Sequence, residues 1–213
     1  MDIHKVYRVF MLRFRPARMK AIKDMFAPTL EGDGSVIDLG GTASWWKDMN
    51  VRTRRITIIN LDDTHKEEVL ASGYQFSAAN ACKLPYASAS FDLAFSNSVI
   101  EHVGGWDEQV AFAREMLRCG KQVYMQTPNK WFPVEPHLIA LFIHWLPFGI
   151  QRHMVRWFSL WAWVTRPDQK TIDEAIKGLK LLSRSEVEQL FPGCEIRSER
   201  VLGLTKSFIV TKR

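Results

Sequence analysis

The sequence predicts an α/β protein with a mostly parallel sheet that is covered by helices on both faces and closed by an antiparallel hairpin. Three observations lead to this fold class. Short segments rich in β-branched residues alternate with segments of helical apolar spacing. The chain has 213 residues, the length of one ordinary α/β domain. With 46% hydrophobic and 24% charged residues it is globular and needs no disulfide to hold its core.

The first half of the chain supplies four predicted strands. Residues 3–26 have apolar side chains at helical spacing, and Pro16 is expected to split them into two helices. Residues 67–71 are expected to form a short helix. The predicted strands cover residues 35–39, 55–61, 74–77 and 91–95, and the β-branched content of the first two indicates that they are buried.

The second half continues this alternation and ends in a hairpin. Asp107 is the expected N-cap of a helix whose inward residues include Val110, and Gly120 is the expected C′ glycine. The remaining elements are a strand at 121–126, a capping box of Ser183 and Glu186 before a helix, and paired strands at 195–202 and 207–211.

Charge and cysteine content narrow the class of protein. The net charge is +6, and residues 1–30 alone hold seven basic and two acidic side chains. This basic N-terminal helical arm, residues 1–33, is either a solvated helix face or a contact with an anionic partner. The three cysteines have no metal-like spacing and predict reduced thiols in a cytoplasmic protein. No secretory signal or membrane-spanning stretch is visible.

Ligands of open α/β sheets bind outside the carboxyl ends of the strands, so the residues that follow each strand carry the functional signal. Four such segments occur in order: VIDLG at 36–40, IINLD at 58–62, NACKLPY at 80–86 and SFDLAFSNS at 90–98. Together they resemble the class I S-adenosylmethionine-dependent methyltransferases, particularly the methyltransferase type 11 branch. The resemblance covers residues 34–127 well and implies a Rossmann-like seven-stranded sheet whose last strand is antiparallel.

The resemblance also implies the cofactor, S-adenosylmethionine, and the residues that bind it. Asp38 and Gly40 match the family's first loop, whereas Thr42 and Ser44 replace two of its glycines. Asn60 replaces the acidic residue that binds the ribose, and Asn80 replaces the aspartate that meets the adenine. The implied cofactor-binding residues are Asp38, Gly40, Gly41, Thr42, Asn60, Leu61, Asp62, Asn80, Ala81 and Ser96.

Candidate catalytic residues are Glu101, His102 and His137. A general base is needed only where the acceptor holds its proton near neutral pH. The segment from Ser98 to His102 is similar to the E-x-x-E-H metal motif of small-RNA 2′-O-methyltransferases and some quinone-precursor O-methyltransferases. Because Ser98 stands where that motif has its first acidic ligand, we expect no metal. The motifs of amino- and C5-methylating nucleic-acid enzymes are absent, so there is no strong nucleic-acid signal.

Residues 128–180 are an insertion that the generic fold does not explain. They begin within a proline-rich loop, residues 126–137, in which Thr127, Asn129, Glu135 and His137 are expected on the acceptor side. Two apolar segments, 138–146 and 152–164, predict a helical pair rich in tryptophan. Three interpretations remain open: a lid over an apolar acceptor pocket, a dimer interface, and a helix pair on a membrane surface.

These observations predict a single methyltransferase domain over residues 1–213, monomeric or dimeric, that methylates a small apolar or aromatic molecule. The alternative is a non-catalytic module that keeps the fold and acts through its basic arm or aromatic surface, which the replacements at Thr42, Asn60 and Asn80 favour. A dinucleotide-dependent oxidoreductase is a distant third, because the glycine spacing is wrong.

Overall fold

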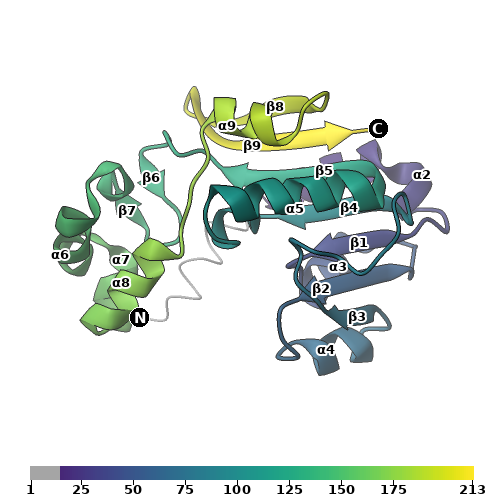
Figure 1. Ribbon diagram of the computed structural model, residues 1–213, viewed down its shortest axis with the longest axis horizontal. Coiled ribbons are helices and arrows are strands. Elements are labelled where there is room, and N and C mark those ends of the chain that lie inside the picture. The colour runs from purple at the N-terminus through teal and green to yellow at the C-terminus, as the bar shows by residue number, and fades with distance from the viewer. Residues whose placement is uncertain (1–14) are drawn as a thin grey trace.

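A computed structural model describes residues 15–213, and its centre is a seven-stranded sheet. The strand order is β3-β2-β1-β4-β5-β9-β8 (Figure 1). All neighbouring strands are parallel except β9, which is antiparallel to both β5 and β8. The predicted seven-stranded sheet with an antiparallel last strand is therefore confirmed. The chain moves outward from β1 in one direction through β2 and β3, and in the other through β4 and β5, so the strand order reverses between β1 and β4.

The strands lie within two or three residues of their predicted positions. The strands differ in burial: β1 and β2, rich in β-branched residues, are buried as expected where helices cover both faces, whereas the edge strands β3 and β8 are partly exposed. Their bounds are β1 (Val36–Leu39), β2 (Ile56–Asn60), β3 (Gln75–Ala78), β4 (Phe91–Asn97), β5 (Gly120–Pro128), β8 (Glu195–Val201) and β9 (Leu204–Lys212). Leu202 and Gly203, both at positive φ, make the turn between β8 and β9.

Helices on the two faces of the sheet enclose separate apolar cores. One face packs against α5 (Trp106–Cys119) and α9 (Arg184–Leu190), with Phe112 and Val187 among its core residues. The other face packs against the helix of residues 15–25 and against α2 (Ala27–Leu30), α3 (Ala43–Met49) and α4 (Lys66–Ala71). The Ser183–Glu186 capping box is confirmed at the start of α9.

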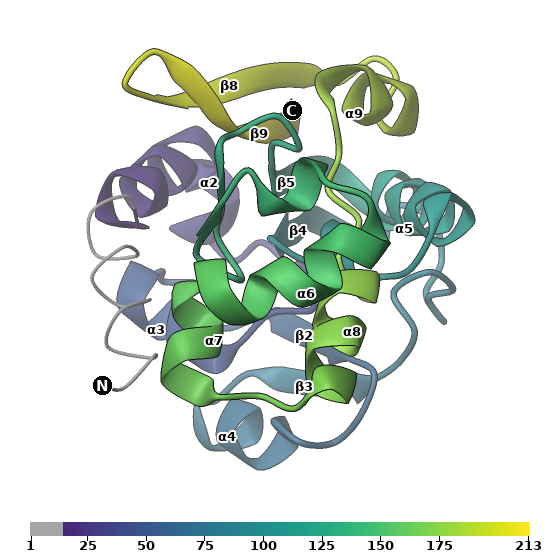
Figure 2. The same cartoon turned by 90° about the vertical axis from the view of Figure 1, so that its left-hand side faces the viewer.

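Between β5 and α9 the chain forms a separate layer opposite the carboxyl ends of the parallel strands (Figures 1 and 2). Its own small core includes Leu138, Ile143, Val155 and Ile172. The elements are β6 (Val134–Glu135), β7 (Ala140–Leu141), the 3₁₀ helix η2 (Ile143–Trp145), α6 (Phe148–Phe158), α7 (Leu160–Thr165) and α8 (Gln169–Lys177).

Two local predictions about this layer and the N-terminal arm need revision. Residues 138–146 are not a helix, because Ile139 and Phe142 have positive φ and Ala140–Leu141 pair with Val134–Glu135. Residues 3–14 of the predicted helical arm lie outside the described residues. Pro16 lies at the start of the helical residues 15–25, and the break within the described part comes at Phe26, before α2.

Three predictions about α5 were also wrong. The N-cap is Gly105, whose amide N–H donates to Glu108 Oε2 at 2.9 Å, and Asp107 lies in the first turn. Val110 is exposed rather than inward. Gly120 has an extended backbone and begins β5, and a Cβ there would lie 2.6 Å from the Cβ of Ala94. It is glycine because β4 approaches closely, whereas a C′ glycine would serve a left-handed turn.

Candidate functional site

The sheet brings the predicted cofactor residues to one edge. Gly40 follows β1, Asn60 ends β2, Asn80 follows β3, and Ser96 lies near the end of β4. These four strands are adjacent and parallel, so their carboxyl ends share that edge. Residues that lie 57 positions apart in the sequence are therefore neighbours. Ser96 Oγ donates to the carbonyl of Leu39 at 3.1 Å, which ties the ends of β4 and β1 together.

The loop after β1 requires both of its glycines. Gly40 has a φ of 75°, and its N–H donates to the carbonyl of Ile59 at 2.8 Å. A Cβ at Gly41 would lie 1.6 Å from Asp38 Oδ2, because the Asp38 side chain lies directly beneath the loop. This close packing leaves the outer side of the loop free of side-chain carbon, as a bound cofactor needs.

Asp38 is a buried carboxyl group with one unsatisfied oxygen. The indole N–H of Trp46 donates to Oδ2 at 2.7 Å, whereas Oδ1 has no hydrogen-bond partner among the described residues. Burial raises the pKa of Asp38 to about 7, and the Trp46 hydrogen bond opposes the shift. A buried acceptor without a donor is costly, so this atom marks a place where a ligand with an N–H group would fit.

The residues expected at the ribose and adenine differ in their hydrogen-bond partners. Asn60 Nδ2 donates to the carbonyl of Gly41 at 3.3 Å, so its side chain lies against the glycine loop. Asp62 and Asn80 are exposed and accept from the amides of Thr64 (3.0 Å) and Cys82 (2.8 Å). The remaining predicted residues flank them: Thr42 caps α3, Leu61 is exposed, and Ala81 is half-buried beside the core.

The structure brings together the three predicted catalytic residues. Glu101 and His102 lie on η1 (Ile100–His102), and His137 comes from the loop between β6 and β7. The Nε2 atoms of the two histidines are 3.1 Å apart, and Glu101 Oε1 lies 3.9 Å from His137 Nε2. Glu135 Oε1 holds His137 Nδ1 at 2.7 Å, which orients that ring.

Burial and charge set the protonation of this cluster. Glu101 is fully buried, and desolvation raises its pKa to about 7. Desolvation, reinforced by His137, lowers the pKa of His102. Burial would lower the pKa of His137 as well, but Glu135 outweighs it and the pKa is raised. The pKa values of the two histidines are thus shifted in opposite directions, and His137 keeps its proton to higher pH than His102.

Two residues expected on the acceptor side lie instead beneath the cluster of Glu101 and His137. Thr127 and Glu135 are fully buried. Thr127 Oγ1 donates to Glu101 Oε2 at 3.0 Å, and Glu135 accepts from His137 and from the amide of Leu138. Both position the cluster rather than face a ligand. Glu101 Oε1, by contrast, is buried without a hydrogen-bond partner.

Glu101, His102 and His137 are the one group of potential metal ligands within the described part of the chain, with ligand atoms within 4.8 Å of one another. The serine that replaces the acidic ligand, Ser98, has a φ of 57° and donates to Gln126 at 2.8 Å. The absence of a metal therefore stays a prediction, which chelation tests.

A cavity of about 480 Å³ opens beside the cofactor edge. Trp45, which follows the glycine loop, and Asn97 and Ser98, which end β4, connect it to that edge. The other lining residues come from the first helix, β5, the insertion and the final hairpin: Arg15, Arg18, Gln126, Pro128, Asn129, Phe132, Val134, Pro136, Ile139, Val201, Leu202, Lys206 and Ser207. An apolar wall with a few polar groups is typical of a small-molecule site.

Sequence reasoning missed the charged wall of this cavity. Arg18 binds both carboxylate oxygens of Glu199, at 3.2 and 2.6 Å, and also contacts Asn97 and Gln126. Arg15 pairs with Asp48 and lies over the Trp45 ring, 4.8 Å from its centroid. No local motif could reveal these contacts, because Arg18 and Glu199 are 181 positions apart in the sequence.

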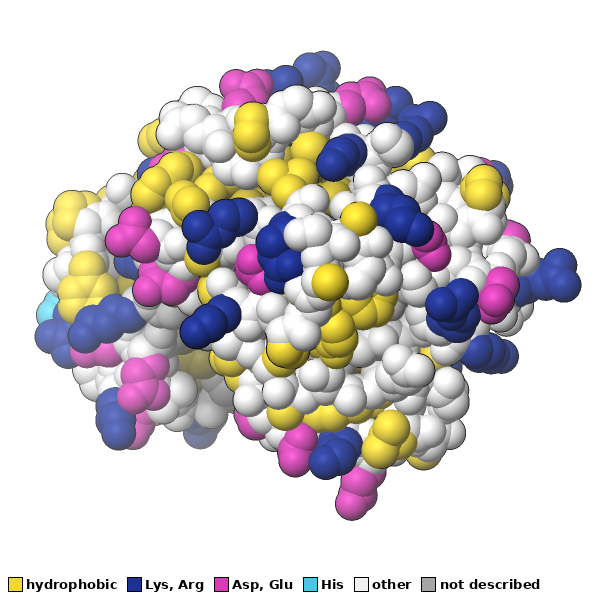
Figure 3. Space-filling view, turned by 45° about the vertical axis from the view of Figure 1, so that its right-hand side comes forward, with side chains coloured by type: hydrophobic (Ala, Val, Ile, Leu, Met, Phe, Trp, Pro, Cys, Tyr) yellow, Lys and Arg dark blue, Asp and Glu magenta, His cyan; other side chains and the backbone are white. Residues whose placement is uncertain are grey.

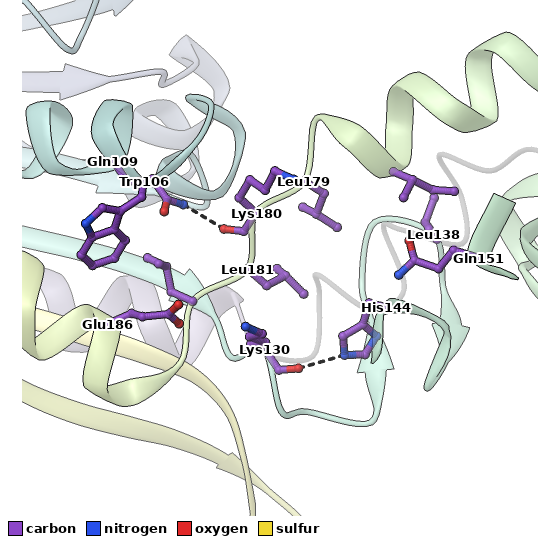
Figure 4. Close-up of a pocket in the computed structure, with 12 residues that line it drawn as sticks. Trp106, Gln109, Lys130, Leu138, His144, Gln151, Leu179, Lys180, Leu181 and Glu186 are labelled. Atoms are coloured by element: carbon purple, nitrogen blue, oxygen red, sulfur yellow. Dashed lines mark hydrogen bonds between the residues drawn. The ribbon is translucent and has the colours of Figure 1, made fainter. Parts of the chain in front are cut away.

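A second cavity of about 300 Å³ lies on the α5 side of the joint between the sheet and the insertion (Figure 4). Gln109 Nε2 donates to the carbonyl of Lys180 at 2.8 Å, and His144 contacts the carbonyl of Lys130 at 3.0 Å. None of its lining residues belongs to the predicted cofactor loops. Its contacts hold the insertion against α5.

Comparison with known proteins agrees with this geometry. Residues 38–122 match the family described as "Methyltransferase domain". Uncharacterized proteins of two Mycobacterium tuberculosis strains are each 34% identical over 93 residues, a match that covers 38% of this chain and 31% of each of them. The chain thus matches less than a third of the length of these relatives.

Solved structures show the same fold at low identity. An S-adenosylmethionine-dependent methyltransferase from Mesorhizobium loti is 16% identical, with a TM-score of 0.52 over 85% of this chain and 91% of that one. The N-methyltransferase NodS from Bradyrhizobium japonicum, in complex with S-adenosyl-L-homocysteine, is 10% identical, with a TM-score of 0.55 over 93% and 85% of the two chains. The PH0226 protein from Pyrococcus horikoshii is 14% identical, with a TM-score of 0.55 over 97% of both.

Proposed function

We propose that this chain, a class I S-adenosylmethionine-dependent methyltransferase by its family match and its fold, methylates a small molecule with an apolar or aromatic body. One observation carries the proposal: the cavity of about 480 Å³ next to the cofactor edge. Its volume falls within the range of small-molecule sites. Its wall from the insertion is apolar, with Phe132, Val134 and Ile139.

The residues at the cofactor edge fit S-adenosylmethionine. Gly40 and Gly41 keep the loop open, Asp38 offers an unpaired buried oxygen, and Asn60 lies beside the loop. When bound, the cofactor supplies an electrophilic methyl group on a sulfonium. The chain's part is to hold the acceptor in line and to exclude water, which supplies much of the rate in such displacements.

The cluster of Glu101, His102 and His137 is proposed to receive the acceptor's proton. His102 is exposed and neutral near pH 7, so it is the member that can accept a proton from solvent or acceptor. The two histidines then share one added proton, and the Glu135 carboxylate beside His137 Nδ1 stabilises the single positive charge. The insertion then serves as a lid, because it supplies both His137 and one wall of the cavity.

Calorimetry with S-adenosylhomocysteine tests whether the chain binds the cofactor. A methyl-transfer screen with phenols, amines and aromatic acids tests which class of acceptor it methylates. We expect Phe132→Ala to weaken acceptor use while cofactor binding stays unchanged. Trp106→Ala, which removes an exposed aromatic ring that lines the second cavity and not this one, is the matched control. Equal losses in both variants would contradict the placement of the acceptor.

A non-catalytic module that keeps the fold is the second candidate. The observation that favours it is the engagement of the side-chain oxygens of Asp62 and Asn80 with nearby backbone amides. Those oxygens are only partly available to a ribose or adenine. Lack of S-adenosylhomocysteine binding by the folded protein would favour this module over the enzyme.

A further inference from the structure

The outer surface of the insertion carries exposed aromatic side chains that the proposed active site does not use. Trp157, Phe158 and Trp163 are 67%, 62% and 63% exposed. Ile150 is 50% exposed and Trp145 is 42% exposed. Large apolar side chains gathered on one segment mark an interaction site, whereas scattered ones are normal on a protein surface.

Helix α6 has two apolar sides, and only one of them faces the protein. Val155 is buried in the small core of the insertion. Ile150, Met154 and Trp157 follow the spacing i, i+4 and i+7, so they form a stripe on a different side of the helix. Ile150 and Trp157 on this stripe are exposed. The helix lies on the outside of the molecule in Figures 1 and 2. Met154 packs against the small core from the edge of this stripe, so Ile150 and Trp157 are the apolar side chains that the fold leaves uncovered.

The charges around this face are mostly basic. Residues 138–180 contain six Lys or Arg and three Asp or Glu, and Asp168 lies near Arg156. Arg152 pairs with Asp173 at 2.6 Å, whereas Arg156 and Arg166 are exposed on either side of α7. The face of the molecule in Figure 3 is different, because basic and acidic side chains are mixed over it. The aromatic face thus favours an anionic partner.

We propose that the outer face of α6 and α7 docks on the surface of an anionic phospholipid bilayer. Ile150, Trp157 and Trp163 would lie at the boundary between headgroups and acyl chains, with Arg156 and Arg166 at the phosphates. No helix in the described part of the chain is long and apolar enough to cross a membrane. A second copy of the chain fits less well, because two faces with an excess of basic side chains would repel each other.

Docking and lid closure use different sides of the insertion. The cavity is lined by Phe132, Val134 and Ile139, none of which belongs to the outer stripe. The proposal therefore stands independently of the acceptor. It also orients the molecule, because the insertion lies between the sheet and the bilayer.

Vesicle flotation with the full chain tests this proposal. We expect binding to vesicles of phosphatidylcholine and phosphatidylglycerol and much weaker binding to phosphatidylcholine alone. Trp157→Ala combined with Trp163→Ala should reduce partitioning by at least about tenfold. Arg156→Gln combined with Arg166→Gln should reduce it by about 25-fold, at about fivefold for each basic residue near the surface. Trp106→Ala, an exposed tryptophan on α5, should leave it unchanged.

Circular dichroism and S-adenosylhomocysteine calorimetry on the same variants show whether they remain folded. The proposal is overturned if the wild-type chain does not float with anionic vesicles. It is equally overturned if the double tryptophan variant floats as well as the Trp106→Ala control. If the tryptophan substitutions instead convert a dimer to a monomer in sedimentation, the face is a contact between copies and the membrane proposal is wrong.

Discussion

Replacement of Gly40 by valine is the most direct test of where the cofactor lies. Gly40 has a φ of 75°, which valine adopts only under strain. Its Cβ would lie 2.6 and 2.8 Å from the two methyl carbons of Val99, so that neighbour must move. The outer side of the loop would also gain a branched side chain in the path of the cofactor.

The two costs can be estimated separately. A left-handed backbone costs a residue with a Cβ about 1 to 2 kcal/mol, and displacing a packed neighbour costs about 1 to 3 kcal/mol. The sum, about 2 to 5 kcal/mol, is smaller than the stability of a typical domain of about 5 to 15 kcal/mol. We therefore expect a folded variant with Tm lowered by about 4 to 20 °C and no detectable binding of S-adenosylhomocysteine.

Gly73 provides the matched control. It has a φ of 77°, and a Cβ there meets nothing within 4 Å. Gly73→Ala therefore carries the backbone strain without the contact, whereas Gly40→Ala carries both. Thermal unfolding by circular dichroism should show the larger loss for Gly40→Ala, and Val99→Ala in the Gly40→Ala background should restore part of it.

Calorimetry then measures whether the folded variants bind S-adenosylhomocysteine, at a temperature where circular dichroism shows the native signal. If Gly40→Val binds S-adenosylhomocysteine as the parent does, the cofactor does not lie over this loop. If Gly73→Ala also loses binding, backbone strain alone explains the effect and the argument from a blocked approach is wrong.

Four further outcomes follow from the site. Asn80→Asp should leave S-adenosylhomocysteine affinity equal or tighter by up to about 1 kcal/mol, since either oxygen can accept from the Cys82 amide; a large loss in calorimetry would place the adenine elsewhere. Glu101 has a folded pKa of about 7, above its ordinary value of 4.5, so its protonation stabilises the fold below pH 4.5 and this contribution is lost as the pH rises to 7. Urea unfolding should show that the wild-type free energy of unfolding falls by as much as about 3 kcal/mol from pH 5 to pH 8. Glu101→Gln should lack this fall, and a variant with the wild-type pH dependence would refute the burial argument. Turnover on an identified acceptor should survive EDTA, and loss that magnesium restores would establish a metal at this cluster. Deletion of residues 138–164 should remove turnover while calorimetry still shows S-adenosylhomocysteine binding. Turnover that persists in the deletion variant would contradict a lid.

The sequence by itself determined where the strands of the sheet lie and which loops follow their carboxyl ends. Buried parallel strands are short runs of β-branched residues, and this pattern is local, so β1, β2, β4 and β5 could be placed within a few residues. The carboxyl ends of parallel strands share one edge, so the cofactor loops could be assigned to one edge before any coordinates were known. The capping box at Ser183 was equally readable, because both of its partners lie within one helical turn.

Only the tertiary structure decided the contents of the site. Glu101 and His137 are 36 positions apart and meet because the insertion folds back onto the end of β4. The segment 138–146 looked helical from its apolar content, yet its backbone pairs with Val134–Glu135, since a short apolar run fits a strand or a helix equally well. Whether a tryptophan faces the core or the solvent depends on what packs against its helix, and that information lies in distant parts of the chain. Pattern within a segment therefore determined the scaffold, and contacts between segments determined the chemistry.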